Sequence, residues 1–259
     1  MKLSRLLLKN EEKQIISITG GGGKTSTLFT LARELANFRV LLTTTTKILL
    51  PESSGLYDIV IEKNNERLLQ LICSKPHKNH IVCGITSEKY PEKLTGCSES
   101  FLNEVKEFYD YILIEADGSA GKPIKAPAEH EPAVSQYSTM YIGVIGMDCL
   151  EKNGSSENVH RPELFSKIRN KRESELISVD DIIRLVNSPV GLFKGSSESG
   201  RKILLLNKGE LLSESIGISM VDRIVEEADF PIEVVLNSYL KSDSVLYNRE
   251  NKPLDFTSA

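Results

Sequence analysis

The sequence lacks an apolar run of the roughly 18 to 20 residues that a membrane-spanning helix needs. Its first residues, 1–13, contain too short an apolar segment for a secretory signal peptide. Both absences predict a cytoplasmic protein that has no membrane partner.

Cysteine is scarce, and no two cysteines form a CxxC pair. The sequence therefore indicates neither a disulfide framework nor a zinc ribbon, because each needs paired or regularly spaced cysteines. We expect reduced thiols at the four positions, which are Cys73, Cys83, Cys97 and Cys149.

An excess of positive charge is also missing. The formal net charge is −4 and the isoelectric point is about 5.7, with Lys and Arg spread along all 259 residues. A protein that holds a nucleic-acid backbone normally gathers its basic residues on one face. The composition therefore predicts no nucleic-acid partner.

Short β-branched runs alternate with amphipathic segments, a pattern typical of an α/β fold. The apolar runs predict strands at 14–19, 39–43, 58–61, 80–85, 111–116, 140–146, 202–207 and 232–237. The amphipathic segments predict helices at 25–36, 65–73, 99–108, 179–186 and 218–228. Because several strands are apolar almost throughout, helices should cover both faces of a mostly parallel sheet. We expect a three-layer sandwich like that of P-loop NTPases, in a single domain over 1–259 with loop insertions near 150–160 and 194–201.

A glycine-rich loop follows the first predicted strand and precedes the first predicted helix. Only glycine lets backbone N–H groups approach a phosphate without a Cβ clash, and the helix that follows offers its positive end. Lys24 should reach the terminal phosphates of a nucleotide, and the Thr25 hydroxyl should bind Mg²⁺. The predicted nucleotide-binding residues of this loop are Gly20, Gly21, Gly22, Gly23, Lys24, Thr25 and Ser26.

The loop departs from the common GxxxxGK[ST] pattern, because Ile18 stands where that pattern has its first glycine. It resembles the compact KGGxGK[ST] variant of the nitrogenase iron protein and MinD class, with Thr19 at the position of the extra lysine. The alternative is a glycine-rich turn that binds no ligand.

The strand predicted at 111–116 ends in two carboxylates, Glu115 and Asp117. Alternation along a strand places both on one face. We predict that Asp117 joins Thr25 in the Mg²⁺ shell and that Glu115 orients an attacking water, so that Lys24, Glu115 and Asp117 form the catalytic group. The alternative is a strand that simply ends in solvent.

A threonine run at 43–46 follows another predicted strand, so it should emerge at the same sheet edge as the loop. The Thr45 hydroxyl could complete the metal shell, and Lys47 could supply the cation that Thr19 does not. Threonine is also a good strand former, and this alternative stays open.

Residues Asn207, Lys208 and Glu210 lie in an NKGE sequence at the end of a buried strand. The sequence resembles the NKxD element of GTPases, whose acid binds the guanine N1 and N2 groups. We therefore add these three residues to the predicted nucleotide site. Because glutamate is one methylene longer than aspartate, the choice between ATP and GTP stays open, as does a turn without any base contact.

Two proline-stiffened stretches near 122–132 and 159–163 display charged and imidazole side chains. They could hold a second substrate or belong to the surface. The candidate second-substrate residues are Lys122, Lys125, His130, Glu131, His160 and Arg161.

Taken in order, the segments GGGGKTS, LLTTTTKI, ILIEADGSAGKPIKAPAEHEP, HRPE and LLLNKGE resemble the YqeC family of selenium-dependent hydroxylase accessory proteins. The resemblance covers residues 15–210 and implies a role in maturing selenium-dependent molybdenum hydroxylases, with such an enzyme or its maturation machinery as partner.

Three functions remain open at this point. The first is a maturation factor that hydrolyses ATP or GTP with Mg²⁺. The second is a kinase or ligase that acts on a small molecule, and the third is a nucleotide sensor without catalysis.

Overall fold

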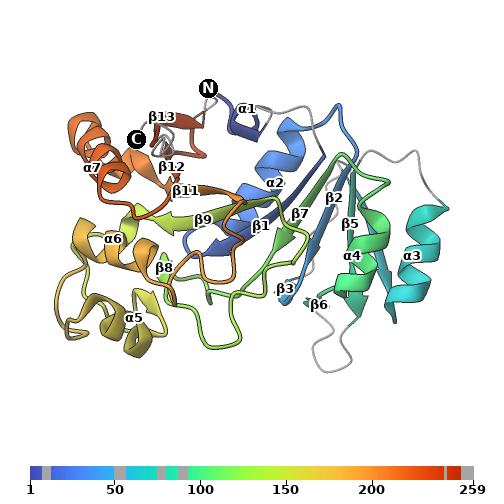
Figure 1. The fold of residues 1–259 in the computed structure, drawn as a ribbon, viewed down its shortest axis with the longest axis horizontal. Helices are drawn as coiled ribbons and strands as arrows, with labels where there is room; N and C mark the ends of the chain where they lie inside the picture. Colours follow the sequence, from blue (N-terminus) through green and yellow to red (C-terminus); the bar gives the residue numbers. More distant parts are fainter. Residues whose placement is uncertain (8–12, 50–56, 75–79, 87–92, 242–243, 252–259) are drawn as a thin grey trace, which may run out of the picture.

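One central sheet with helices on both faces organises the chain (Figure 1). The computed structural model describes residues 1–7, 13–49, 57–74, 80–86, 93–241 and 244–251. The sheet has eleven strands in the order β13-β12-β11-β9-β1-β7-β2-β5-β6-β3, with β4 paired to β5. The predicted α/β class with a mostly parallel sheet is confirmed.

The eight parallel strands are the eight that the sequence predicts. Their bounds are β1 Gln14–Gly20, β2 Val40–Thr44, β4 Asp58–Glu62, β5 His80–Thr86, β7 Tyr111–Glu115, β9 Met140–Gly146, β11 Arg201–Asn207 and β12 Glu233–Asn237. Every residue of β1, β2, β7, β9 and β12 is buried. Such strands need cover on both faces, which the helices provide.

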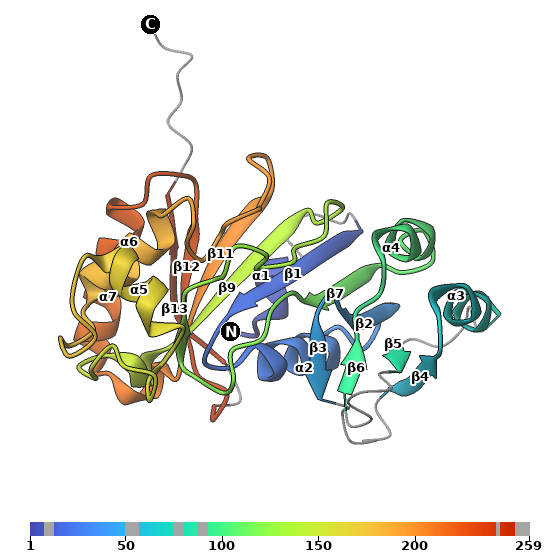
Figure 2. The same cartoon turned by 90° about the horizontal axis from the view of Figure 1, so that it is seen from below.

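Seven α-helices lie within the described residues. They are α1 Ser4–Leu7, α2 Lys24–Glu34, α3 Asn65–Cys73, α4 Glu99–Val105, α5 Pro162–Arg169, α6 Val179–Asn187 and α7 Glu214–Glu226. Leu28 and Leu31 of α2 pack with Ile16 and Ile18 of β1 on one face of the sheet. On the other face, α3 and α4 cover one end and α5, α6 and α7 the other, as Figure 2 shows. The molecule therefore has three layers.

Several short or polar elements are not visible in the sequence pattern. They are α1, α5, β3 Lys47–Leu49, β6 Lys93–Thr95, β8 Ile124–Lys125, β10 Val159–His160 and the antiparallel edge strand β13 Val245–Glu250. Strands of two or three residues carry no measurable periodicity. In α5, Pro162 occupies the first turn, where proline's missing N–H costs nothing, so the proline read as a loop stiffener starts a helix.

The segments predicted as loop insertions lead into two strands, of which β10 belongs to a separate two-stranded sheet and β11 to the central sheet. Residues 150–160 end in β10, which pairs in parallel with β8, and residues 194–200 form turns that lead into β11. Within the described ranges, no helix combines the length and apolarity that crossing a bilayer requires. The single domain stays a prediction.

The packing of α6 can be tested with two leucines. Leu185 is fully buried in the core, whereas Leu240 is 83% exposed. We expect Leu185→Ala to lower the free energy of unfolding by about 2 to 5 kcal/mol, because it leaves a cavity. Leu240→Ala should change it by less than about 0.5 kcal/mol. Urea unfolding measures both, and equal effects would contradict the placement of α6 on the core.

Candidate functional site

A cavity of about 800 Å³ opens at the carboxyl ends of the central parallel strands. This is the edge at which open α/β sheets bind their ligands. Its lining combines the glycine-rich loop, carboxylates, lysines and a histidine, namely Gly22, Gly23, Lys24, Thr25, Ser26, Lys47, Lys93, Glu115, Gly118, Ser119, Ala120, Gly121, Glu131, His160, Asn207 and Lys208. Eleven of these sixteen are residues that the sequence analysis names for the nucleotide, metal, catalytic or second-substrate sites, with Lys47 as the candidate extra cation.

The glycine-rich loop is hydrogen-bonded to neighbouring segments on one side and lines the cavity on the other. The amide of Gly21 donates to the Val144 carbonyl and that of Gly22 to the Lys122 carbonyl, both at 2.9 Å. A Cβ on Gly21 would lie 2.5 Å from the same Lys122 oxygen, so only glycine fits there. Gly23 has φ 137°, a backbone conformation that side chains rarely adopt. The loop is therefore locked in one shape that faces the cavity.

Helix α2 begins directly after the loop, at Lys24. Its N-cap residue, Gly23, has no side chain with which to bind the first-turn amides. Those amides have no acceptor within a helix, and they carry the positive end of its dipole. Because Lys24, Thr25 and Ser26 line the cavity, this helix end is available to an anion.

The structure brings the predicted catalytic group together. The Lys24 Nζ donates to the Gly20 carbonyl at 2.7 Å and lies 3.3 Å from Asp117 Oδ1 and 4.0 Å from Glu115 Oε1. Lys24 is only 4% exposed. Its ammonium group therefore sits beneath the loop, between both carboxylates.

The two carboxylates occupy different surroundings. Asp117 is 2% exposed, is absent from the cavity lining, and accepts the Gly20 amide at 3.1 Å. Glu115 lines the cavity, and its Oε2 accepts the Thr25 hydroxyl at 3.1 Å. Burial raises the pKa of Glu115 above its usual range, against the opposing effects of Lys24 and the Thr25 hydrogen bond. Asp117 thus fixes the loop, and Glu115 faces the ligand space.

The segment after β7 continues the charge network. Lys125 is 1% exposed and lies 3.2 Å from Asp117 and 2.5 Å from Glu131. Glu131 also pairs with Arg161, whose Nη2 donates to Glu131 Oε1 at 3.0 Å. Burial alone would raise the pKa of Glu131, but the hydrogen bonds from Arg161 and Lys125 outweigh it and lower this pKa to about 2. The pKa of His160 is lowered by burial and by the nearby cations of Arg161 and Lys125, so its imidazole is neutral near pH 7.

The remaining candidate second-substrate residues point elsewhere. The Lys122 Nζ donates to the Glu157 carbonyl at 2.9 Å, and His130 is exposed; neither lines the cavity. Only Glu131 and His160 of that set face the ligand space. Lys125 and Arg161 lie outside the cavity lining and form ion pairs with Glu131.

The threonine run connects elements of the fold. Thr43 donates to the Cys83 carbonyl, Thr44 to the Glu115 carbonyl at 2.8 Å, and Thr45 to the Ala133 carbonyl at 2.5 Å. A role for Thr45 in a metal shell would require its hydroxyl to leave this bond. Thr19, at the position of the extra loop lysine, is buried and donates to the Leu192 carbonyl at 3.2 Å.

The NKGE residues lie at the end of β11, two strands from β1. Asn207 Nδ2 donates to the Gly22 carbonyl at 2.8 Å, so it also braces the loop. Lys208 adopts left-handed φ 62° and lies 2.5 Å from Asp148. Glu210 is outside the cavity lining, and its Oε2 is buried without a hydrogen-bond partner among the described residues. The two lining residues of this element are therefore Asn207 and Lys208.

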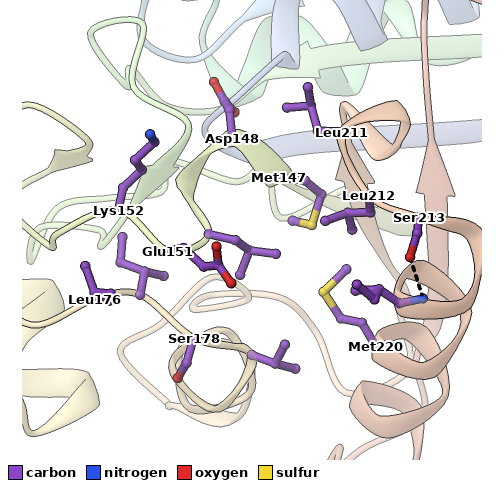
Figure 3. Close-up of a pocket in the computed structure, with 14 residues that line it drawn as sticks. Met147, Asp148, Glu151, Lys152, Leu176, Ser178, Leu211, Leu212, Ser213 and Met220 are labelled. Carbon is purple, nitrogen blue, oxygen red and sulfur yellow. Dashed lines mark hydrogen bonds between the residues drawn. The ribbon is translucent and has the colours of Figure 1, made fainter.

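A second, apolar cavity of about 660 Å³ has in its lining Asp148, the ion-pair partner of Lys208 (Figure 3). Its walls come from two short 3₁₀ turns, η1 Met147–Cys149 and η2 Gly209–Leu211, and from the starts of α6 and α7. In Figure 3, Met147, Met220 and Leu212 lie around its centre and Lys152 at its edge.

Comparison with known proteins places the chain in a family. The model of the YqeC protein family matches residues 16–163. The chain belongs to the YqeC family. A relative from Escherichia coli (strain K12), described as uncharacterized protein YqeC, is 32% identical over 219 residues, which are 83% of this chain and 84% of the relative. No solved structure matches the chain at a significant level.

Five lining residues of this YqeC family member were not expected from sequence. Gly118, Ser119, Ala120 and Gly121 form the turn after β7, and Lys93 begins β6. This turn comes directly after the acidic end of β7. A turn in that position could have been predicted from sequence to line a ligand site. Lys93 lies in a three-residue strand and offers no such signal.

The Glu131 ion pairs predict a specific pH dependence of stability. The pKa of Glu131 in the folded protein lies below its ordinary value of 4.5. The ionised Glu131 side chain therefore adds its full contribution to the free energy of unfolding above pH 4.5, and this contribution is lost as the pH falls toward 2. We expect Glu131→Gln to lower the free energy of unfolding by about 1 to 3 kcal/mol at pH 7, because hydrogen bonds to a charge are lost.

The difference in the free energy of unfolding between Glu131→Gln and the wild type should shrink as the pH falls from about 4.5 toward 2. The matched control is Glu129→Gln, because Glu129 is exposed and should contribute less than about 0.5 kcal/mol at any pH. Denaturant titrations across this pH range measure both. A constant difference for Glu131→Gln would show that its charge plays no part.

Proposed function

We propose that this protein binds a purine nucleoside triphosphate with Mg²⁺ and hydrolyses it, as an accessory factor in maturing selenium-dependent molybdenum hydroxylases. The observation that carries nucleotide binding is the open glycine loop at the start of α2, with Lys24, Thr25 and Glu115 grouped beside it. The maturation role rests on the YqeC family resemblance alone.

The phosphates would lie against the first-turn amides of α2, at the front of the loop. Lys24 would turn from the Gly20 carbonyl and the carboxylates toward the β- and γ-phosphates. The phosphates would replace the negative partners of the ammonium group, and Mg²⁺ would take over the compensation of Glu115. Asp117 would remain paired with Lys125 and the Gly20 amide, so the loop would keep its shape.

The residues beside the loop fit a magnesium ion. The Thr25 hydroxyl and the Glu115 carboxylate are adjacent hard oxygen ligands, and the raised pKa of Glu115 is expected of a carboxylate placed where a cation would compensate its burial. Magnesium would neutralise charge on the β- and γ-phosphates. We therefore assign the metal-facing role to Glu115, and to Asp117 the positioning of the loop.

Charge balance favours the magnesium complex over the free nucleotide. The described network contains three cations and three carboxylates, Lys24, Lys125, Arg161, Glu115, Asp117 and Glu131. A free triphosphate would add negative charge to a network that is already neutral. The two positive charges of Mg²⁺ offset about half of the roughly four negative charges that a free triphosphate would add.

The base would extend toward β11, where Asn207 and Lys208 line the cavity. Glu210 follows them with one unpartnered carboxylate oxygen among the described residues, which a guanine N1–H and N2–H could satisfy after a side-chain movement. This favours GTP over ATP. A kinase or ligase remains the second candidate, because the cavity continues past the loop toward His160.

Nucleotide binding should depend on Lys24. We expect Lys24→Ala to raise the Kd for the magnesium–nucleotide complex at least tenfold, a loss of about 1.4 kcal/mol or more, since it removes the cation nearest the terminal phosphates. Lys122→Ala is the matched control, because its side chain points to Glu157 outside the cavity.

Calorimetric titration measures both variants, with circular dichroism to confirm folding. Because Lys24 is buried between carboxylates, Thr25→Ala provides a milder second variant: it should weaken binding with Mg²⁺ and leave binding in EDTA unchanged. Unchanged affinity in both variants would remove the loop from nucleotide binding.

The base contact can be tested separately. We expect Glu210→Ala to weaken GTP binding about tenfold and to spare ATP, because only guanine presents N–H donors to a carboxylate at that edge. Glu214→Ala, in the exposed first turn of α7, should affect neither nucleotide. Parallel GTP and ATP titrations measure this, and an equal loss for both would reject guanine recognition.

A further inference from the structure

The cavity extends well beyond the place where a nucleotide would lie. Strand β1 and its loop are at the centre, β11 is two strands away on one side, and β2 is two strands away on the other. With neighbouring strands about 4.8 Å apart, the distance from β11 to β2 is roughly 19 Å. If the base lies toward Asn207 and Lys208, the described residues leave the half beside β2 open.

Two lysines border this open half from one small ladder. In the antiparallel pairing of β3 and β6, Lys47 lies opposite Thr95, and Leu49 lies opposite Lys93. Side chains alternate along a strand, so Lys47 and Lys93 are on the same face of the ladder. Leu94, on the opposite face, is 2% exposed and packs against Gly84. The apolar face is thus used for packing and the cationic face lines the cavity.

The ladder is fixed to the acidic end of β7. A Cβ on Gly96 would lie 2.4 Å from the Thr45 carbonyl carbon, and the Cys97 amide donates to the Thr44 carbonyl at 2.9 Å. Thr44 in turn donates its hydroxyl to the Glu115 carbonyl. These contacts hold the lysine-bearing face next to Glu115, and therefore next to the position proposed for the γ-phosphate.

The same cavity lining also contains hydrogen-bond acceptors and a left-handed turn. His160 is neutral near pH 7, and Glu131 is ionised. Ala120 and Gly121 have consecutive left-handed φ values of 48° and 73°, and a Cβ on Gly121 would meet nothing within 4 Å. Left-handed alanine costs free energy, and such strain is common in ligand-binding turns.

We propose that this half of the cavity binds a second ligand, a small molecule that carries a phosphate or carboxylate group together with a hydroxyl or amine donor. Lys47 and Lys93 hold its anionic group. His160 and Glu131 accept hydrogen bonds from its donor. The ligand's place beside the γ-phosphate rests on the proposed nucleotide site, but its recognition by Lys47 and Lys93 does not.

Phosphate binding tests the lysine side of this site. The protein is first saturated with Mg²⁺ and a non-hydrolysable GTP analogue, and inorganic phosphate is then titrated with ³¹P NMR detection. We expect phosphate to bind alongside the analogue, and Lys93→Gln and Lys47→Gln each to weaken phosphate binding about fivefold or more. The charge-matched control is Lys152→Gln, because Lys152 is exposed at the neighbouring apolar cavity. It should bind phosphate like the wild type.

The donor side is tested with O-phosphoethanolamine, which adds an ammonium donor to the same phosphate group and carries no carboxylate. It should bind at least fivefold more tightly than inorganic phosphate, and His160→Phe should remove that difference. Because Lys47 is exposed and Lys93 half-buried, both lysine variants should keep the wild-type Tm.

Three results would overturn the second site. They are displacement of the nucleotide analogue by phosphate, unchanged phosphate affinity in Lys93→Gln and Lys47→Gln, and an equal loss in Lys152→Gln. If the analogue does not bind at all, the proposed nucleotide function fails. The same phosphate titration of the nucleotide-free Lys24→Ala protein, alone and combined with Lys93→Gln, then decides the second site independently.

Discussion

An alternating series of buried charges holds this protein's candidate site together. Lys24, Asp117, Lys125, Glu131 and Arg161 follow one another in ion contact, from the glycine loop to the start of α5. Removing one buried member would leave its neighbours uncompensated, which is far more costly than losing a surface ion pair. These ion pairs therefore fix the relative positions of the elements that carry the five residues.

This constraint explains why the residues after β7 matter to a loop almost a hundred positions earlier in the chain. Lys125 holds Asp117, Asp117 accepts the Gly20 amide, and the Lys122 carbonyl accepts the Gly22 amide. Asn207 completes the support from the other side through the Gly22 carbonyl. With Val144 of β9, whose carbonyl accepts the Gly21 amide, three separate segments thus fix a loop whose own residues are mostly glycine and would otherwise be flexible.

How far the sequence can predict such a site depends on the range of the interactions. The glycine loop, the strand before it and the acidic end of β7 are local patterns, and the eight parallel strands follow from runs of apolar residues. The direction of a polar side chain is not local. Thr45 and Lys125 look like ligand-facing residues in sequence, yet their partners are the Ala133 carbonyl and Asp117. Lys93 looks unremarkable in sequence, because only the β3–β6 ladder places it at the cavity.

The same contacts connect the two halves of the cavity. Glu115 bonds Thr25 of the loop through its side chain and Thr44 through its backbone carbonyl, and Thr44 anchors the segment that leads to Lys47 and Lys93. If the proposed nucleotide binds, a shift of the Glu115 backbone would reach the lysine-bearing ladder through Thr44. Because linkage between two binding sites is reciprocal, an anion bound at the ladder would change nucleotide affinity by the same factor. Linkage of this kind would let the proposed second ligand and the proposed nucleotide each change the affinity of the site for the other.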